Sequence, residues 1–538
     1  MVDKIGSISI PYAEAGFFSK LVTDYLNEKE ELKEFYKHPV SIEGIKASIE
    51  ERKSFNTNRK LLVDQLTNQY KGIQLTAIQT VNLQALLAKE TFTVTTAHQP
   101  NIFTGPLYFV YKIIHAIKLA DELKEQLPEY DFIPVYYMGS EDADLDELGN
   151  ITLNGEKLIW NTNQTGAVGR MKVDKGLLQI IKSIAGQIGI HPYGNDLINL
   201  YEQCFTIGKT IQQATLELVN SLFADYGLLI LIPDNAPLKA SFNKIIKKEL
   251  VQQFSHVEVL KTVKELSKLY KVQASGRELN LFYLFEDKRE RIELKELASN
   301  GKSFTVSVLK KEWTLNDILI ELNEFPERFS GNVILRGLFQ ETILPNIAFI
   351  GGGGELAYWL ELKGVFDAAN IPYPVLLLRN SLLLVNDKQA NKIEKLGLTE
   401  VDSFLSSEAL LKNVVLKHSE NKLDLTEEVK QLNEIYSQLK NKVSTVDATL
   451  IEHIDSLEKL ALKKVIALER KMLRAEKRKF KEHQHQIIVL KQSLFPHNNL
   501  QERVENFSTF YALYGEKWLQ LIYKASLTLE QEFCILKM

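Results

Sequence analysis

Apolar and polar positions along the first third of the chain predict a strand, a loop, a helix and a second strand. The β-branched run from Thr93 to Ala97 ends at a polar loop with two prolines, and helical periodicity then continues to about Leu127. A second apolar run, Phe132 to Met138, ends on a group of acids. These runs are typical of neighbouring strands in a parallel sheet. Open α/β sheets bind ligands at the carboxyl ends of such strands.

Four later apolar runs are also typical of buried strands, and each one is followed by polar residues or glycines. The run at 227–232 precedes Asp234, and the run at 333–335 precedes Arg336. The run at 347–350 leads into four glycines, and the run at 375–378 leads into Arg379. We therefore expect one sheet whose strand ends carry acids, arginines and a glycine loop.

Helical periodicity dominates the two ends of the chain. The first ninety residues interleave charged and apolar positions and indicate a packing layer in front of the sheet. Between Val429 and Leu457, apolar residues recur at alternating spacings of three and four, the pattern of a coiled coil or a long helical hairpin. Alternation around 286–288 predicts a β-hairpin, and the loop Ser275–Arg277 before it is a candidate to present a cation.

Composition and charge argue against several classes of protein, namely nucleic-acid-binding, membrane-spanning and disulfide-rich proteins. The chain of 538 residues is 45% apolar and 25% charged, which is typical of a globular protein with two or three domains. Its formal charge of -4 gives no reason to propose nucleic acid as a partner. Met1 to Ser7 contain no basic segment before an apolar block, and no later apolar run is long enough to span a bilayer. We expect a cytoplasmic protein with no membrane partner. Cys204 and Cys534 lack metal-type spacing, so neither a disulfide framework nor a metal site is expected.

The loop after the first strand carries the first candidate site. His98 and Gln99 follow the strand directly, and Pro106 suits the first turn of the following helix. Thr104 and Gly105 precede that turn, where a hydroxyl and backbone amides can meet an anion at the positive helix end. The alternative is structural: His98 caps a turn and Gln99 bonds a loop carbonyl.

The acids after the second strand form the second candidate site. Glu141, Asp142 and Asp144 follow a strand too apolar to be exposed. Carboxylates at that place can accept from an amine or from sugar hydroxyls, hold Mg²⁺, or act as a general base. Asp142 and Asp144 would face the same side of an extended chain. The alternative is a solvated acidic face, and for Asp234 a helix cap.

The glycines and the arginines form the third candidate site. Gly351–Gly354 precede a helix, so backbone amides there can approach an anionic ligand closely. The run lacks the lysine of a phosphate-binding nucleotide loop and the spacing of a dinucleotide fingerprint, and a flexible connector is the alternative. Arg336 and Arg379 each follow an apolar run, and a guanidinium suits a carboxylate or phosphate. A structural ion pair with one of the acids is the competing explanation.

These motifs together resemble the BshC family, the cysteine ligases assigned to bacillithiol biosynthesis. The motifs occur in the family's order over nearly the whole chain. They are Thr96–Pro100, Phe103–Tyr108, Gly139–Asp144, Leu335–Arg336, Gln340–Pro345, Glu355–Trp359, Leu378–Ser381 and Leu500–Arg503. Two positions depart from the family pattern: Ala143 stands where histidine is common, and Gly353 stands where proline is common.

The resemblance implies an α/β fold with a Rossmann-like, nucleotidyltransferase-type core, an inserted connecting α+β domain and a C-terminal α-helical coiled coil. On this basis the chain divides into five segments. Residues 1–150 hold the helical layer and the first half of the core, and 151–330 the remaining core strands with the inserted domain. Residues 331–385 hold the second half of the core, 386–492 the coiled-coil arm, and 493–538 C-terminal helices that dock on the core.

The resemblance also implies an activity: addition of L-cysteine to the amine of glucosaminyl malate, which makes bacillithiol, by a homodimer paired through the coiled coil. His98, Gln99, Asp142 and Asp144 become the candidate catalytic residues. The candidate substrate-binding residues are Thr104, Gly105, Tyr108, Glu141, Arg336, Gln340, Gly352, Gly353, Glu355, Arg379 and Asn380. Amide formation needs an activated carboxyl, so ATP is expected on chemical grounds, with Mg²⁺ as a candidate companion.

Two other functional classes fit the same pattern. One is a nucleotidyltransferase or a pantothenate synthetase-like ligase that uses the same core on another small substrate. The other is a non-catalytic assembly protein whose functional part is the long helical arm.

Overall fold

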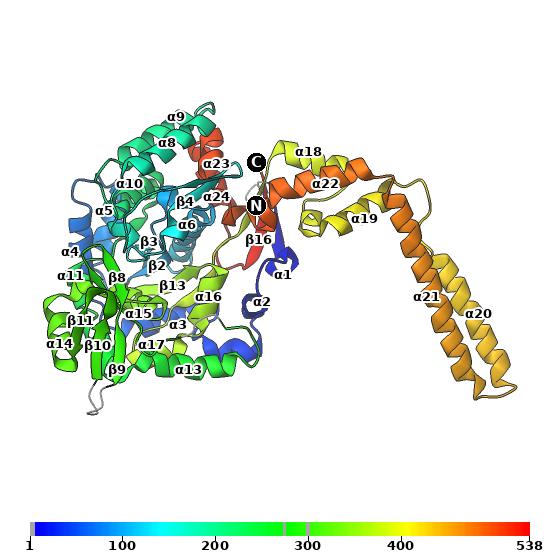
Figure 1. The fold of residues 1–538 in the computed structure, drawn as a ribbon, viewed down its shortest axis with the longest axis horizontal. Helices are drawn as coiled ribbons and strands as arrows, with labels where there is room; N and C mark the ends of the chain where they lie inside the picture. The colour runs from blue at the N-terminus through cyan, green and yellow to red at the C-terminus, as the bar shows by residue number, and fades with distance from the viewer. Residues whose placement is uncertain (1–5, 273–275, 297–301) are drawn as a thin grey trace. The chain divides into compact units, whose positions relative to one another are not determined.

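The computed structural model describes residues 6–272, 276–296 and 302–538 (Figure 1). Met1 to Ile5 and Ser275, which entered the sequence analysis, therefore lie outside the described residues. The chain forms two units. One comprises residues 1–383 and 501–534, and the other comprises 384–500 and 535–538.

Five parallel strands form the central sheet of the first unit (Figure 1). Their order is β14-β13-β2-β3-β6, and each neighbouring pair is parallel. Numbered along the chain, this is the strand order of a Rossmann-like sheet, with the switch point between β2 and β13. The predicted parallel sheet is confirmed. Its strands are β2 (Thr91–His98), β3 (Asp131–Met138), β6 (Leu229–Leu231), β13 (Asn346–Gly351) and β14 (Val375–Leu378).

Both faces of this sheet are covered by helices. Phe92 and Val94 of β2 share an apolar core with residues of α3 (Ile42–Lys53) and α6 (Tyr108–Gln126), so these two helices cover one face. On the other face, Phe349 of β13 stacks on Trp359 of α16 (Gly353–Leu360), with ring centroids 4.4 Å apart. Burial of each such side chain stabilises the fold by about 1.5–3 kcal/mol. This double cover explains why the central strands are buried along their length, including the threonines of β2.

Mainly helical structure precedes β2, as predicted. Ser41 begins α3 by accepting a hydrogen bond from the Gly44 N–H at 3.0 Å. Strand β1 (Ser7–Pro11) was not predicted. It lies in a three-stranded sheet of order β1-β16-β15, with β15 (Leu382–Val385) and β16 (Glu532–Lys537). The remaining helices of this layer are α1 (Tyr12–Ala15), α2 (Lys20–Leu26), η1 (Glu30–Phe35), α4 (Arg59–Gln69) and α5 (Ala77–Ala85).

A mostly helical segment connects β3 to β6. It begins with α7 (Leu145–Leu148) and the hairpin of β4 (Asn150–Leu153) and β5 (Glu156–Ile159). Three helices follow, namely α8 (Lys175–Ile188), α9 (Gly194–Cys204) and α10 (Ile211–Phe223). The 3-10 turns of the first unit after η1 are η2 (Ile102–Thr104), η3 (Val168–Arg170), η4 (Ala224–Tyr226), η5 (Ser307–Leu309), η6 (Pro326–Arg328) and η9 (Gln501–Arg503).

An α+β insertion lies between β6 and β13, at the crossover between the two halves of the sheet. The predicted hairpin is confirmed as β7 (Leu281–Phe285) and β8 (Lys288–Arg291), with β12 (Phe329–Gly331) on the other side of β7. A second small sheet contains β9 (Glu293–Glu296), β10 (Lys302–Val306) and β11 (Lys311–Thr314). The helices are α11 (Ala236–Ala240), α12 (Asn243–Gln252), α13 (Phe254–Leu266), α14 (Leu315–Glu324) and α15 (Val333–Ile343).

The prediction of a strand at 333–335 is wrong, because these residues begin α15. The Asn332 side chain accepts a hydrogen bond from the Ile334 N–H at 2.9 Å and starts the helix. A short apolar run has the same composition in a buried helix and in a buried strand, so periodicity could not separate them. The helix predicted after the four glycines is present as α16, and a second helix, α17 (Lys363–Ala369), follows it. The first unit ends with α23 (Ser508–Tyr514) and α24 (Glu516–Ala525).

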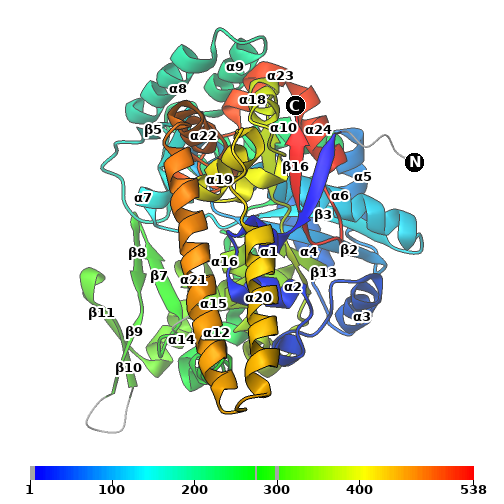
Figure 2. The same ribbon diagram turned by 90° about the vertical axis from the view of Figure 1, so that its right-hand side faces the viewer.

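The second unit contains a long helical hairpin. Helices α20 (Thr426–Ser444) and α21 (Leu450–Lys477) lie side by side (Figures 1 and 2). Lys440 of α20 forms ion pairs with Asp455 at 2.6 Å and Glu458 at 2.5 Å. The periodic pattern over 429–457 is therefore a hairpin that turns between the two helices. The other elements are α18 (Asp387–Lys395), η7 (Val401–Phe404), α19 (Ser407–His418), α22 (Lys481–Leu494) and η8 (Pro496–Asn498).

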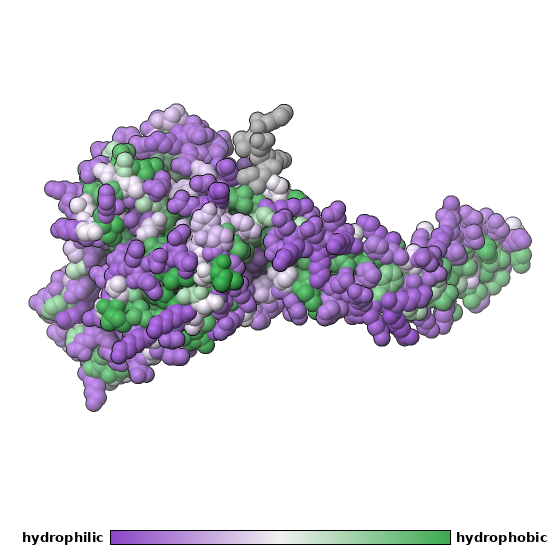
Figure 3. Space-filling model, turned by 90° about the horizontal axis from the view of Figure 1, so that it is seen from above, coloured by the Kyte–Doolittle hydropathy of each residue, from purple (hydrophilic) through white to green (hydrophobic). Residues whose placement is uncertain are grey.

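Apolar side chains are left exposed along this hairpin. Ile435 is 52% exposed and Leu460 is 54% exposed. Figure 3 shows apolar surface, in green, along the same arm. In the part of the chain that the structure describes, no helix combines the length and the apolar character needed to cross a bilayer.

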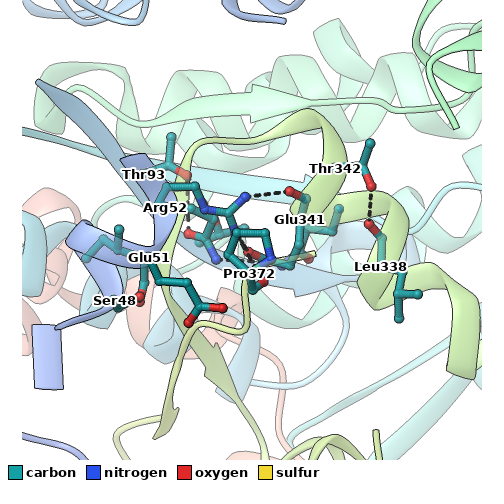
Figure 4. A network of polar contacts seen from close by, with 12 residues as sticks. Ser48, Glu51, Arg52, Thr93, Leu338, Glu341, Thr342 and Pro372 are labelled. Carbon is teal, nitrogen blue, oxygen red and sulfur yellow. Dashed lines mark hydrogen bonds and ion pairs between the residues drawn. The ribbon is translucent and has the colours of Figure 1, made fainter. Parts of the chain in front are cut away.

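A buried polar network ties α3 to α15 and to the start of β13 (Figure 4). Arg52 donates to the Glu341 carboxylate at 2.6 Å and to the Glu341 carbonyl at 2.7 Å. Gln340 and Asn346 donate to the other carboxylate oxygen, and Thr93 of β2 donates to Asn346. The Arg52 and Glu341 side chains are 1% and 0% exposed. Burial raises the pKa of Glu341 to about 7, although Arg52 and the donors oppose that shift.

We predict that Arg52→Met lowers the free energy of unfolding by about 3–5 kcal/mol, because it leaves the Glu341 carboxyl buried without its cation. Urea denaturation followed by tryptophan fluorescence measures this. Lys46→Met on the exposed face of the same helix is the matched control, with a change within about 0.5 kcal/mol. Equal effects of the two substitutions would contradict a stabilising role for the network.

Candidate active site

A cleft of about 740 Å³ opens at the carboxyl ends of the central strands. His98 and Gln99 at the end of β2 line it, together with Gly139–Asp142 after β3. Gly352–Glu355 after β13 and Arg379 after β14 complete this side. The cleft thus lies at the switch point of the sheet, where Rossmann-like folds bind their ligands.

His98 is held as a neutral imidazole. Its side chain is buried, and its ring meets the edges of Tyr108 at 5.3 Å and Phe109 at 5.4 Å between centroids. Burial lowers the pKa of His98 well below its usual value of 6.5, and the positive charge of Lys112 adds to this effect. Among the described residues, none hydrogen-bonds to His98 Nε2. A neutral ring nitrogen in the cleft wall is thus left for a ligand.

Among the described residues, Asp142 and Glu147 are cleft carboxylates without a direct cation partner. Gln99 Nε2 donates to Asp142 Oδ2 at 3.1 Å, and the Asp144 N–H donates to Oδ1 at 3.3 Å. No described lysine, arginine or histidine forms an ion pair with it. Gln99 therefore orients a carboxylate that can accept from an amine or ammonium group of a ligand.

The other acids near the strand ends are already neutralised. Lys239 forms an ion pair with Glu141, and Ser330 Oγ donates to Glu141 at 2.9 Å. Arg170 donates twice to Asp234, at 2.6 and 2.7 Å. Asp234 is therefore an ion-pair partner, and its neighbour Asn235 caps α11. These contacts hold the cleft wall together and leave Asp142 as the better candidate for ligand contact.

The glycine loop presents its helix to the cleft, but the positive end of that helix already carries a carboxylate. The Glu355 carboxylate accepts from the Gly352 N–H at 2.8 Å, at the first turn of α16. Its carboxylate also forms an ion pair with Lys112, a fully buried lysine of α6 that donates to the Ala97 carbonyl at 2.9 Å. Burial lowers the pKa of Lys112, and Glu355 opposes that shift. Gly352 and Gly353 line the cleft beside this pair.

Arg336 enters the cleft from helix α15 rather than from a strand end, which corrects its predicted setting. Its Nη2 donates to the Tyr358 hydroxyl at 3.3 Å. Burial acts to lower the pKa of Arg336, but the neighbouring oxygens of Tyr358 and Asp142 outweigh it, so the pKa is raised. The guanidinium is charged and lies near the unpaired carboxylate of Asp142.

Arg379 follows β14 as predicted and is held by the C-terminal segment. Its Nη1 contacts Glu502 at 2.7 Å and donates to Ser381 Oγ at 3.2 Å. Its guanidinium lies over the Tyr108 ring, 5.0 Å from the centroid. Glu502 is fully buried, and the next residue, Arg503, lines the cleft. Arg379 therefore does form a buried ion pair, but its partner is Glu502 and not one of the acids after the second strand, and its side chain borders the cleft.

Five predicted site residues lie outside the cleft lining. Asp144 caps α7 by accepting from the Glu147 N–H at 3.0 Å, and Gln340 belongs to the buried Arg52 network. Asn380 donates to the Leu527 carbonyl at 2.9 Å. The N–H groups of Thr104 and Gly105 donate to loop carbonyls at 3.1 and 3.0 Å, so neither amide is left for an anion.

The cleft also contains residues that the sequence did not single out. They include Lys112, Lys239, Phe282, Arg289 and Arg291. The sequence did contain a feature that marks Lys112, since it is the one lysine or arginine within the apolar run 109–117. For Arg289 and Arg291 the indication is weaker: they are alternate residues of a predicted strand. Lys239 reaches the cleft only through tertiary packing, whereas Tyr358 lies within the motif Glu355–Trp359 but was not named there as a site residue.

Fold and cleft together define a Rossmann-like α/β protein that has a cleft at its switch point and a helical hairpin in its second unit. Two models of a single protein family together match nearly the whole chain. Residues 5–380 match the model described as "Bacillithiol biosynthesis BshC, N-terminal Rossmann-like domain". Residues 382–538 match "Bacillithiol biosynthesis BshC, C-terminal coiled-coil domain". The chain belongs to the BshC family.

Curated relatives match over nearly the full length and carry the name "Putative cysteine ligase BshC". The protein from Flavobacterium johnsoniae is 40% identical over 98% of this chain and 99% of its own length. The protein from Christiangramia forsetii is 40% identical over 98% of each chain. A solved structure titled "Crystal structure of putative arginyl t-RNA synthetase from Campylobacter jejuni" aligns with 85% of this chain and 100% of its own chain, at 12% identity. Its TM-score of 0.22 is too low to carry an argument.

We predict that His98 stays neutral across the range in which an ordinary histidine titrates. Because burial and nearby cations depress its pKa, protonation begins well below pH 6.5. NMR of the protein with ¹³C-labelled histidine follows the ring shifts with pH, and loss of a signal in His98→Gln assigns the residue. A midpoint near 6.5 for that signal would contradict the described electrostatics.

Proposed function

We propose that this chain is a ligase that forms the amide bond between the carboxyl of L-cysteine and the amine of glucosaminyl malate, giving bacillithiol. Membership of the BshC family and the name of its relatives support this reaction class. The observation that carries the proposal is the meeting of three kinds of group in one cleft. They are a neutral imidazole, a carboxylate without a cation partner, and several arginines.

The substrates need this combination. Glucosaminyl malate brings an amine, sugar hydroxyls and two carboxylates, and cysteine brings an ammonium, a carboxylate and a thiol. Asp142, oriented by Gln99, binds the ammonium or takes a proton from the acceptor amine as it attacks. His98 Nε2 makes a hydrogen bond to the reacting carboxyl. Arg336 or Arg379 binds a carboxylate of the malate.

ATP is part of the proposal, because a free carboxylate does not react with an amine. When bound, ATP would supply the activation of the cysteine carboxyl, with Mg²⁺ on its phosphates. The glycine loop is a poor phosphate cradle, since Glu355 already occupies the Gly352 amide. Arginines of the cleft without an ion-pair partner, such as Arg503, fit phosphate oxygens better.

We predict that the purified protein forms bacillithiol from cysteine, glucosaminyl malate and ATP, and that His98→Ala and Asp142→Asn each reduce the rate by about 10²–10⁴-fold. Thiol-specific labelling and mass spectrometry measure the product. Asp146→Asn in the same acidic segment is the matched control, since Asp146 is exposed and lies outside the cleft lining.

Three results would contradict this proposal. Absence of product under all nucleotide conditions would contradict a self-sufficient ligase. Turnover of another small acid with ATP would favour a nucleotidyltransferase or a pantothenate synthetase-like ligase. Full thiol production by both cleft variants would favour an assembly protein without catalysis.

Homodimerisation through the helical hairpin is a second element of the proposal. Exposed apolar residues on α20 and α21 include Ile435, Leu439, Leu457 and Leu460. Such a row on an otherwise charged hairpin is typical of a helix–helix interface. A second copy of the chain would bury it.

We predict a dimer in analytical ultracentrifugation, and a monomer for the double variant Ile435→Glu/Leu439→Glu, because two carboxylates in an apolar interface are costly to bury. Ser437→Glu, between those positions and also exposed, is the matched control and should leave the dimer intact. A monomeric parent protein, or equal behaviour of both variants, would exclude this interface.

A further inference from the structure

The inserted hairpin carries cationic side chains of the cleft that have no ion-pair partner. In the described part of the chain, eight basic and four acidic side chains line the cleft. Three of these basic side chains are paired with carboxylates: Lys112 with Glu355, Lys239 with Glu141, and Arg379 with Glu502. Arg289 and Arg291 of β8 form no ion pair with any described carboxylate. The excess positive charge therefore lies largely on the insertion.

Strand geometry brings these two arginines to one face. Arg289 and Arg291 are alternate residues of β8, so their side chains leave the same side of the hairpin. Phe282 of β7 is the cross-strand partner of Arg291. Both guanidiniums lie over the Phe282 ring, 3.9 Å from its centroid for Arg289 and 4.6 Å for Arg291. The ring holds two like charges beside each other by cation–π attraction.

The nitrogens of this pair are incompletely satisfied. Arg289 Nε and Arg291 Nη1 are buried and have no hydrogen-bond partner among the described residues. Burial lowers the pKa of Arg289, and the neighbouring charges of Arg336 and Arg291 add to this, while Glu141 and Asp142 oppose it. The two guanidiniums repel each other, and the bound charge of an oxyanion that contacts both would offset this repulsion.

We propose that Arg289 and Arg291, held on Phe282, form an anion subsite that binds a multiply charged oxyanion of a substrate, either the dicarboxylate of the acceptor or the phosphates of ATP. The subsite itself is inferred from the geometry of β7 and β8. The choice of these two candidate ligands, the acceptor and ATP, rests on the proposed function. A guanidinium pair gives several parallel donors, which matches two carboxylates or successive phosphates and exceeds what one carboxylate requires.

Binding measurements on the full chain test the subsite without relying on turnover. Isothermal titration uses three probes, namely glucosaminyl malate, Mg-ATP and inorganic pyrophosphate. Arg289→Gln and Arg291→Gln each weaken the probe that occupies the subsite by about 10- to 100-fold, because each removes a charged hydrogen-bond donor. Arg289→Lys keeps the charge and loses the planar fork, so it gives an intermediate loss.

Lys288→Gln is the matched control. It removes a positive charge from the same strand, but the alternation of β8 places Lys288 on the opposite face, where it donates weakly to Thr165 at 3.3 Å. Its expected effect on each Kd is below about twofold, the size of a screened surface charge. Thermal unfolding of every variant confirms that the hairpin is folded.

The outcomes separate the subsite from the reaction. Loss of glucosaminyl malate binding alone assigns the subsite to the acceptor's carboxylates. Loss of Mg-ATP and pyrophosphate binding assigns it to phosphates. Pyrophosphate binding that depends on Arg289, in a protein that does not bind glucosaminyl malate, supports the subsite and contradicts the proposed reaction. Unchanged affinity of all three probes in Arg289→Gln and Arg291→Gln overturns the subsite, whatever the parent protein catalyses.

Discussion

The parallel alignment of β2, β3, β13 and β14 is the constraint on which the site depends. Because the strands run in one direction, everything that follows them meets at one edge of the sheet. His98, Asp142, the glycine loop and Arg379 are far apart in sequence, yet they border a single cleft. The helices α3, α6 and α16 bury both faces of the sheet and so hold these strand ends in place.

Ion pairs within the protein then determine which charged side chains of the cleft can still bind a ligand. Lys112, Glu141 and Asp234 lie at or near the cleft, but each already has a partner of opposite sign. Asp142 is held by an amide and not by a cation, and His98 is kept neutral by burial. The insertion adds cations to a core whose own cations are largely neutralised. The core thus supplies the candidate catalytic residues His98 and Asp142, and the insertion supplies much of the unpaired positive charge.

Sequence reasoning located the strand ends, because apolar runs followed by polar residues are a strong signal of an α/β sheet. It placed His98, Asp142 and Arg379 at the correct edge for this reason. It misjudged the setting of Arg336, since three apolar residues before it look alike in a helix and in a strand. It expected anion-binding amides at Thr104 and Gly105, but these amides are used within their own loop. It did not reveal Glu355 as the partner of Lys112, because that pairing is made only by the tertiary fold. The family resemblance, by contrast, covered the chain from end to end, and both family models bear it out.

A crystal structure of the protein with glucosaminyl malate tests the central claim most directly, namely that the cleft at the switch point is the substrate site. The account predicts the acceptor amine within hydrogen-bond distance of Asp142, with the malate carboxylates on arginine side chains of the same cleft. A ligand bound elsewhere on the chain, with Asp142 and His98 free of contact, would contradict it.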